Sequence, residues 1–254
     1  MKAQWSACPT CVYPFQTGDQ RDKSTIHSLI GLISSFRNLF YCFVIFLVSL
    51  PSNGFAEKRG VVAAGHELAA QAGINALDRG GNAVDAAVAI GLTLGVVDGF
   101  NSGIGGGCFM LIRTPRGELV ALDGRETAPE KAHRDMYLRD GQAVSGLSQK
   151  GALAVGVPGA LATFDTALRR YGKLELADLL LPAAEIAESG FPVNQTFYGR
   201  VASVVQTLRE FPEIQSVYLD AELNPFQVGD TFVQPQLAES YRLIASDGIS
   251  AFYN

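Results

Sequence analysis

A run of glycines at 103–107, followed directly by two short apolar segments, most constrains how this chain can fold. Residues 108–113 and 118–123 are short, apolar and extended in character, and Thr114–Gly117 between them supplies the Pro and Gly of a tight turn. This pattern predicts a β-hairpin. Because glycine has no Cβ, the run in front of the hairpin allows another backbone segment or a ligand to approach closely.

Glycine runs also occur in nucleotide-binding loops, but the order of elements here disfavours that interpretation. Such a loop follows a strand and opens a helix whose N-terminus faces the phosphate. Here a helix-like segment precedes the run, a strand follows it, and no Gly-Lys-Ser/Thr is present. Two interpretations remain: a tight helix-to-strand turn, or a turn that also shapes a pocket.

Arg125 follows the second predicted strand and is preceded by Gly124. An arginine at a strand end, beside a residue without a side chain, can direct a planar fork of donors at a carboxylate in a cleft. The alternative is an ordinary surface arginine paired with Glu126 or Asp123. Both interpretations stay open on these residues alone.

Composition sets broad limits on function. With 254 residues, 48% of them hydrophobic, the chain can bury a sizeable core in one domain or two. A net charge of -5 and the lack of a basic stripe argue against nucleic acid or an anionic membrane as a partner.

Residues 1–28 are polar and contain a Cys-x-x-Cys pair, Cys8 and Cys11. Zinc would need a second ligand pair, and a redox site would need a βαβ context; neither lies nearby. We therefore expect 1–28 to be a non-structural leader, and one explanation is a mis-assigned translation start.

The next segment, 29–56, has the layout of a secretory signal peptide. Arg37 precedes the apolar run 39–50, and small residues at Gly54 and Ala56 fit a cleavage site. The predicted location is therefore periplasmic or secreted. The alternative is a membrane anchor formed by residues 29–50.

From residue 59 onward we expect one domain in which helices outnumber strands. Asn82 is a predicted helix cap, Asp85 a structural residue at the positive end of a helix, and His66 a local hydrogen-bonding residue. Besides the hairpin, short strands are expected at 61–64 and 153–155. Helices are expected at 67–79, 83–97, 160–171, 176–188, 195–210 and 235–245.

Several motifs, in order, resemble the large-subunit half of γ-glutamyltransferases, also called glutathione hydrolases. The resemblance covers about 59–254, and a set of ordered motifs is far more specific than any one of them. The motifs are 60–66, 69–73, 80–89, 102–111, 122–129, 155–159, 171–174, 181–193 and 247–253.

The resemblance implies an α/β fold: a partial αββα sandwich of the N-terminal nucleophile hydrolase type, helix-rich and truncated. The family transfers or hydrolyses γ-glutamyl groups of glutathione and related amides. Its nucleophile is a threonine that begins the small subunit, and that segment would lie beyond Asn254. The chain alone is thus expected to hold no catalytic residue, metal or cofactor, and to depend on that small subunit.

By the same resemblance, Arg125 stands where the family places the arginine that binds the α-carboxylate of the glutamyl group. Gly124 replaces a residue that is often bulkier, and Cys108 replaces a glycine and is expected to be a buried, inert thiol. Two alternatives to the transferase remain. One is a glutaryl- or cephalosporin-type acylase of the same fold, and the other is an inactive large-subunit scaffold fragment.

Overall fold

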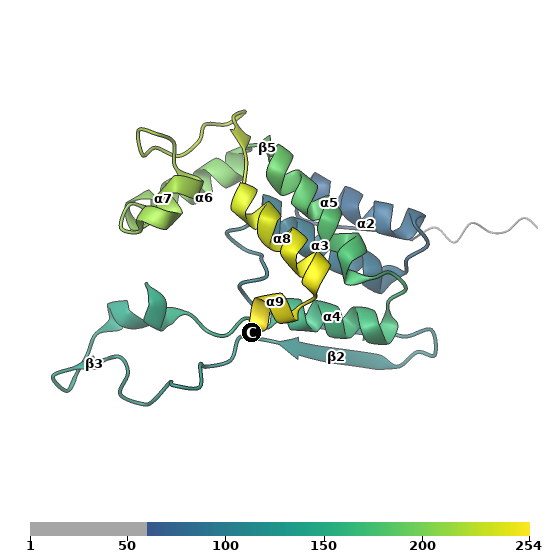
Figure 1. Cartoon of the computed structure of the whole chain (residues 1–254), viewed down its shortest axis with the longest axis horizontal. Coiled ribbons are helices and arrows are strands. Elements are labelled where there is room, and N and C mark those ends of the chain that lie inside the picture. The colour runs from purple at the N-terminus through teal and green to yellow at the C-terminus, as the bar shows by residue number, and fades with distance from the viewer. Residues whose placement is uncertain (1–59) are drawn as a thin grey trace, which may run out of the picture. The chain divides into compact units, whose positions relative to one another are not determined.

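The computed structural model describes residues 60–254, and the predicted leader at 1–28 and signal-peptide-like segment at 29–56 lie outside the described residues. Within 60–254, none of the helices combines the length and apolar character needed to cross a bilayer. Four helices, α2 (Glu67–Asp78), α3 (Ala83–Val97), α5 (Leu176–Ser189) and α8 (Pro235–Asp247), lie side by side in Figure 1. Their facing apolar side chains form the main core.

Helix α3 begins at the predicted cap Asn82, and α2 begins after His66, which caps it. His66 Nδ1 accepts a hydrogen bond of 3.3 Å from the Leu68 N–H, which confirms its local role. Asn82 Oδ1 accepts one of 2.7 Å from the Val84 N–H, and Asp85 Oδ2 accepts one of 2.7 Å from the Asn82 N–H. These contacts satisfy backbone donors that the first helical turn leaves without intrahelical partners.

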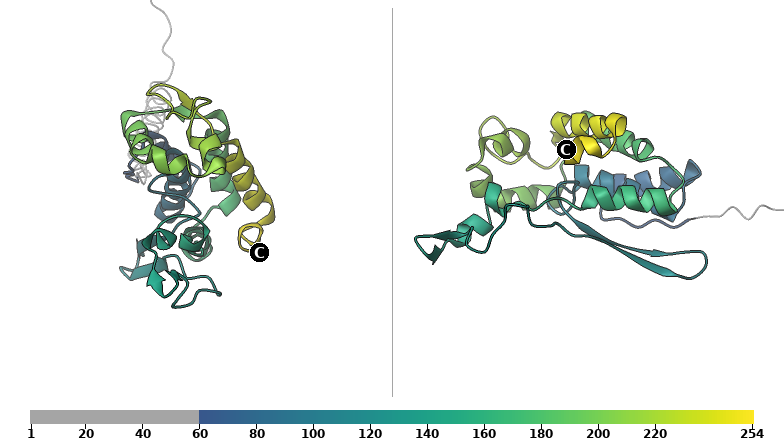
Figure 2. Two further views of the ribbon diagram at one scale, coloured as in Figure 1. Left: turned by 90° about the vertical axis from the view of Figure 1, so that its left-hand side faces the viewer. Right: turned by 60° about the horizontal axis from the view of Figure 1, so that its bottom comes forward.

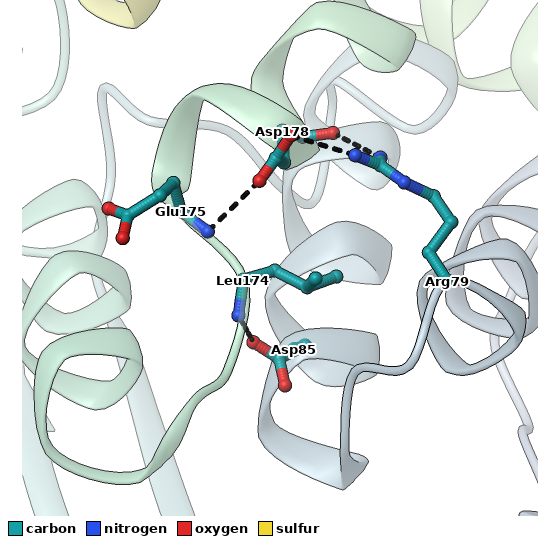
Figure 3. Close-up of polar contacts among 5 residues, drawn as sticks. All are labelled: Arg79, Asp85, Leu174, Glu175 and Asp178. Carbon is teal, nitrogen blue, oxygen red and sulfur yellow. Dashed lines mark hydrogen bonds and ion pairs between the residues drawn. The ribbon is translucent and has the colours of Figure 1, made fainter.

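Asp85 does more than cap its own helix. It is fully buried, and its Oδ1 accepts hydrogen bonds of 2.9 Å from the N–H groups of Lys173 and Leu174, in the segment that leads into α5. Figure 3 shows the bond from Leu174. A Cβ added to Gly172 would lie 2.8 Å from Oδ1. Gly172 is therefore needed for close approach.

An ion pair outside this buried contact joins α2 to α5. Arg79, which follows α2, donates hydrogen bonds of 2.8 Å to the carbonyl oxygen and to Oδ1 of Asp178, and Asp178 Oδ2 accepts from the Glu175 N–H at 3.2 Å (Figure 3). Both charged side chains are about two-fifths exposed, so the pair contributes less than the buried Asp85 contacts.

The predicted hairpin is confirmed. Strands β1 (Cys108–Arg113) and β2 (Leu119–Gly124) pair antiparallel, and the turn between them places Gly117 at φ 86°. Figures 1 and 2 show this ribbon along α4 (Ala160–Tyr171), on the side away from α8. The inner face packs on Val84 and Ala167.

The outer face of the hairpin is exposed to solvent in this structure. Phe109, Leu111 and Leu119 are 71%, 70% and 72% exposed, respectively. The residues that alternate with them along the two strands, including Met110 and Leu122, pack inward. Apolar side chains on both faces are typical of a strand that lies between two layers.

The remaining elements are short or peripheral. Helices α6 (Gln195–Leu208), α7 (Pro212–Tyr218) and α9 (Ser250–Tyr253) complete the helical part. Strands β3 (Leu138–Arg139) and β4 (Gln142–Ala143) pair in a mostly exposed segment, and β5 (Phe191–Pro192) pairs with β6 (Thr231–Phe232) over the aromatic end of the core. The 3₁₀ turns are η1 (Ser145–Ser148) and η2 (Ala152–Ala154).

Two strand predictions were wrong. Residues 61–64 are not in a strand, and Val61 is 97% exposed. Residues 153–155 overlap η2 instead, and the antiparallel bridge falls two residues later, between Thr127 and Val157. A short apolar run does not specify a strand without a partner in register, and neither run has one among the described residues. The helix-rich α/β fold class itself is confirmed.

Candidate functional site

A polar cavity of about 580 Å³ lies where the glycine run meets the end of β2. The end of α3, the glycine run, the end of α7 and the first half of α8 form its walls. Its lining residues are Gly95, Gly99, Phe100, Asn101, Ser102, Gly103, Ile104, Gly105, Gly106, Gly107, Arg125, Glu126, Tyr218, Gln234, Leu237 and Tyr241. By contrast, a cavity of about 530 Å³ between α2 and α5 is mainly apolar.

The glycine run is both a tight turn and a wall of this cavity, so the two interpretations of it are compatible. Gly103 has φ 151°, which side chains disfavour. The Gly106 carbonyl oxygen accepts hydrogen bonds of 3.0 and 3.1 Å from the N–H groups of Gly159 and Ala160. The turn is therefore fixed to the N-terminus of α4.

Close backbone contacts explain Gly124. A Cβ at this position would lie 2.0 Å from Thr163 Oγ1, and a Cβ at Gly159 would lie 2.3 Å from the Gly124 carbonyl oxygen. Thr163 is buried and donates to the Gly159 carbonyl oxygen at 2.9 Å. The bulkier residue expected from the family does not fit this packing, because the Thr163 side chain occupies the space that a Cβ at Gly124 would take.

Arg125 lines the cavity. It also makes the contacts with Glu126 and Asp123 that were expected of an ordinary surface arginine. Its Nη1 lies 3.1 Å from Glu126 Oε2, its backbone N–H donates to Asp123 Oδ1 at 2.9 Å, and its side chain is 59% exposed. The guanidinium is thus open to solvent and to the cavity. Its assignment as a substrate-binding residue stays a prediction.

From the sequence alone, Glu126 was only a possible ion-pair partner of Arg125. Its side chain is 28% exposed, yet Oε2 is buried and makes no hydrogen bond within the described residues. The 3.1 Å contact with Arg125 therefore has the distance of an ion pair without the geometry of a hydrogen bond. A buried acceptor in that state is uncommon and calls for an explanation.

Two tyrosines form the side of the cavity away from β2. Tyr241 is buried and donates to the Leu92 carbonyl oxygen at 3.1 Å, and burial raises its pKa strongly. Burial also raises the pKa of Tyr218. Both hydroxyls are therefore neutral near neutral pH. Gln234, also buried, donates from Nε2 to the Val96 carbonyl oxygen at 2.8 Å and fixes the start of α8 against α3.

Cys108 has the environment of an unreactive thiol. Desolvation raises its pKa, with a smaller rise from Glu126, and a hydrogen bond with Thr163 partly opposes the shift. Since the thiolate is the reactive form, a raised pKa slows its chemistry. Among residues 60–254, no group of three or more His, Cys, Asp or Glu side chains is arranged to hold a metal ion.

Sequence reasoning found Arg125 but not the residues opposite it. Tyr218 and Gln234 follow Arg125 by about a hundred residues, and no local motif links them to the glycine run. Helix α7, which carries Tyr218, was not predicted either, although Pro212 at its first turn was a usable start signal.

Comparison with known proteins gives the family. The gamma-glutamyltranspeptidase family model matches residues 69–254. The Escherichia coli (strain K12) glutathione hydrolase proenzyme is 41% identical over 197 residues, which are 77% of this chain and 34% of that protein. The chain therefore belongs to the gamma-glutamyltranspeptidase family, which confirms the resemblance seen in the sequence.

Solved structures agree with this assignment. The gamma-glutamyltranspeptidase of Helicobacter pylori matches with a TM-score of 0.75 at 38% identity, covering 77% of this chain and 56% of that chain. A cephalosporin acylase from Bacillus halodurans matches with a TM-score of 0.64 at 28% identity, covering 80% of this chain and 40% of that chain. The fold is that of part of an N-terminal nucleophile hydrolase. The chain spans about a third of the length of the curated relatives it matches.

Proposed function

We propose that residues 60–254 form the donor-binding part of an enzyme that transfers or hydrolyses γ-glutamyl groups of glutathione and related amides. The observation that carries this proposal is the position of Arg125, which lines a polar cavity of about 580 Å³ beside the glycine turn of a gamma-glutamyltranspeptidase family chain.

The chemistry of the donor fits this cavity. A γ-glutamyl group ends in an α-carboxylate, and a guanidinium can donate two parallel hydrogen bonds to it. Such charge-assisted bonds contribute about 1.5–3 kcal/mol each, and more is lost when the substrate carboxylate is left unpaired in a dry pocket. Gly105 and Gly106, which line the cavity without side chains, leave room for the extended donor beside the arginine.

The proposed reaction needs a nucleophile from outside the described residues. In the proposed mechanism, the free α-amine of an N-terminal threonine takes the proton from its own hydroxyl, and the oxygen attacks the γ-amide carbonyl carbon. The C–N bond breaks as the amine leaves with a proton, and an acyl-enzyme forms. Water or an amino acid then attacks the ester, which releases glutamate or a new γ-glutamyl amide and restores the hydroxyl.

The small subunit that supplies the threonine is the partner we propose for the hairpin. The outer face of β1 and β2 exposes Phe109, Leu111 and Leu119, which is an apolar surface suited to a second layer of strands. We propose in addition that the protein is exported to the periplasm or secreted, on the basis of the signal-peptide pattern at 29–56.

The test is a hybrid in which residues 60–254 replace the matching segment of the E. coli relative. The hybrid should release p-nitroaniline from a γ-glutamyl anilide, and Arg125→Ala should raise KM by roughly tenfold or more because the carboxylate loses its partner. Arg116→Ala is the matched control, since Arg116 lies in the hairpin turn, at the opposite end of β2. An unchanged KM in Arg125→Ala removes this residue from the site.

The same hybrid separates the two alternatives. The structural match to a cephalosporin acylase favours a glutaryl donor as the second candidate. A glutaryl anilide lacks the α-amino group, so equal turnover of the two anilides would indicate an acylase. A folded, processed hybrid that turns over neither donor would indicate an inactive scaffold.

A further inference from the structure

We propose that Glu126 is a positioning residue that holds the Arg125 guanidinium at the cavity. This inference rests on the proposed function for the role of Arg125, but the contacts that fix Glu126 do not depend on a substrate. Glu126 lines the cavity and lies next to the glycine turn, with its Oε2 buried.

The backbone on each side of Glu126 is fixed. Before it, the Arg125 N–H donates to Asp123 Oδ1 at 2.9 Å. After it, Thr127 and Val157 exchange two hydrogen bonds, of 3.1 and 2.8 Å. The direction in which the Glu126 side chain leaves the backbone is therefore set by contacts on both sides.

Three glycines form the niche that receives this side chain. An added Cβ would lie 2.6 Å from Glu126 Oε2 at Gly107, 3.6 Å from Oε1 at Gly106, and 3.0 Å from the Glu126 Cβ at Gly156. Any side chain at Gly107 would displace the carboxylate. The glycine run thus has a second role, which is to make room for an acidic side chain beside the cavity.

The carboxylate is the fixed member of the pair and the guanidinium is the movable one. Glu126 is 28% exposed and Arg125 is 59% exposed, at a separation of 3.1 Å between Oε2 and Nη1. A buried carboxylate oxygen without a hydrogen bond is costly, and a nearby cation offsets that cost. Glu126 therefore attracts Arg125 and limits the directions that the long side chain samples.

The geometry of the pair leaves Arg125 able to bind a ligand. The contact lacks hydrogen-bond geometry within the described residues, so it holds the guanidinium by charge and not by a directional bond. It involves Nη1, which leaves the edge formed by Nε and Nη2 for two parallel hydrogen bonds to a substrate carboxylate. Because Glu126 limits the motion of the free Arg125 side chain, less conformational entropy is lost when Arg125 binds a carboxylate.

The first experiment measures Arg125 in the full chain without substrate. Modification by phenylglyoxal, followed residue by residue by mass spectrometry, reports how available each guanidinium is. Glu126→Gln should speed modification of Arg125 by roughly two- to fivefold, as expected for the loss of a partly exposed ion pair. Glu126→Asp should give an intermediate rate, because it keeps the charge with a shorter reach.

A matched control comes from a second exposed ion pair. Arg242 is paired with Glu188, so Glu188→Gln should speed modification of Arg242 and leave Arg125 unchanged. Arg79, paired with Asp178, should react at the same rate in all variants. An Arg125 rate that is unchanged in both Glu126→Gln and Glu126→Asp overturns the inference.

The second experiment uses the active hybrid and separates this inference from the proposed function. Glu126→Gln should raise KM for the γ-glutamyl anilide by roughly three- to tenfold with a smaller change in kcat, and Glu126→Asp should recover part of the loss. If Arg125→Ala raises KM but neither Glu126 variant does, the positioning role is wrong and the proposed function stands. If the Glu126 variants change the rate of Arg125 modification while Arg125→Ala leaves KM unchanged, the positioning role stands and the proposed substrate-binding role of Arg125 is wrong.

Discussion

Asp85, in the first turn of α3, accepts a hydrogen bond of 2.9 Å from the Lys173 N–H, although 88 residues separate the two along the chain. The same carboxylate accepts from Leu174 and Asn82, so one buried side chain joins the start of α3 to the start of α5. A structural role at the positive end of a helix was predicted from the sequence, but the long-range contacts were not.

Removing this carboxylate should destabilise the domain. Asp85→Ala leaves several buried N–H groups without an acceptor, which we expect to cost about 3 kcal/mol. Because the matched segment is 34% of the E. coli relative, a hybrid that unfolds as one unit should show a decrease in Tm of roughly 2–3 °C by calorimetry. The exposed Asp135→Ala is the control and should change Tm little; equal effects would contradict the structural role of Asp85.

Glycine should be needed at position 172 because the Asp85 side chain lies close to its Cα, and not because of its backbone conformation. Its φ is −80°, which any residue adopts, but an added Cβ would lie 2.8 Å from Asp85 Oδ1. Gly172→Ala should therefore cost about 1–3 kcal/mol of stability through overpacking. Gly146, where an added Cβ would meet nothing within 4 Å, is the matched position, and Gly146→Ala should be nearly neutral.

Within the glycine run, two neighbouring positions should respond differently. A Cβ at Gly107 would lie 2.6 Å from Glu126 Oε2 and 2.7 Å from the Gly124 carbonyl oxygen, whereas a Cβ at Gly105 would meet nothing within 4 Å. Gly107→Ala should therefore raise KM in the hybrid by roughly tenfold, since a displaced carboxylate no longer holds Arg125. Gly105→Ala should change KM by less than about twofold. Similar values for the two variants would show that the glycines act only through the turn.

Alkaline pH should weaken the domain through Tyr241. Burial raises its pKa above the ordinary value of 10.0. Above that pH the unfolded chain releases the phenolic proton while the folded chain keeps it, so stability decreases as pH rises. In the hybrid, Tyr241→Phe should lower Tm at pH 8 by removing the hydrogen bond to Leu92 but should flatten the decrease between pH 9 and pH 11. A parallel decrease in both proteins would assign the alkaline loss to other groups.

Residues 59–254 alone should be poorly soluble because of the hairpin face. Replacing Leu111 and Leu119 with threonine keeps strand-compatible residues and removes exposed apolar surface, so more protein should remain monomeric in gel filtration. Leu122→Thr, on the inner face, should instead impair folding. A monomeric, cooperatively melting 59–254 without substitutions would contradict the expectation.

Local signals predicted much of the fold, and the limits of that prediction have a physical origin. Asn82 and Gly117 act on their own neighbours, so the start of a helix and the hairpin turn could be located from the sequence. The strands expected at 61–64 and 153–155 failed because pairing depends on a partner elsewhere in the chain.

The candidate site was only partly predictable for the same reason. Arg125 was recognised from its place after a strand and from the family motif, and its cavity position is compatible with that prediction. The niche around Glu126 depends on Gly107, which precedes the Cys108–Gly124 pair of the hairpin, and on Gly156, which precedes Val157 in its bridge with Thr127. No spacing in the sequence reports that contact.

Tyr253 has a practical bearing on any fusion made at this end of the chain. Its hydroxyl donates to the Pro158 carbonyl oxygen at 3.0 Å and accepts from the Ala162 N–H at 3.2 Å, so α9 holds the N-terminus of α4. Because Gly106 is bonded to that same N-terminus, a junction that cuts into α9 would loosen the glycine turn from a distance. Linkers should therefore be attached after Asn254 and should leave the phenol ring in place.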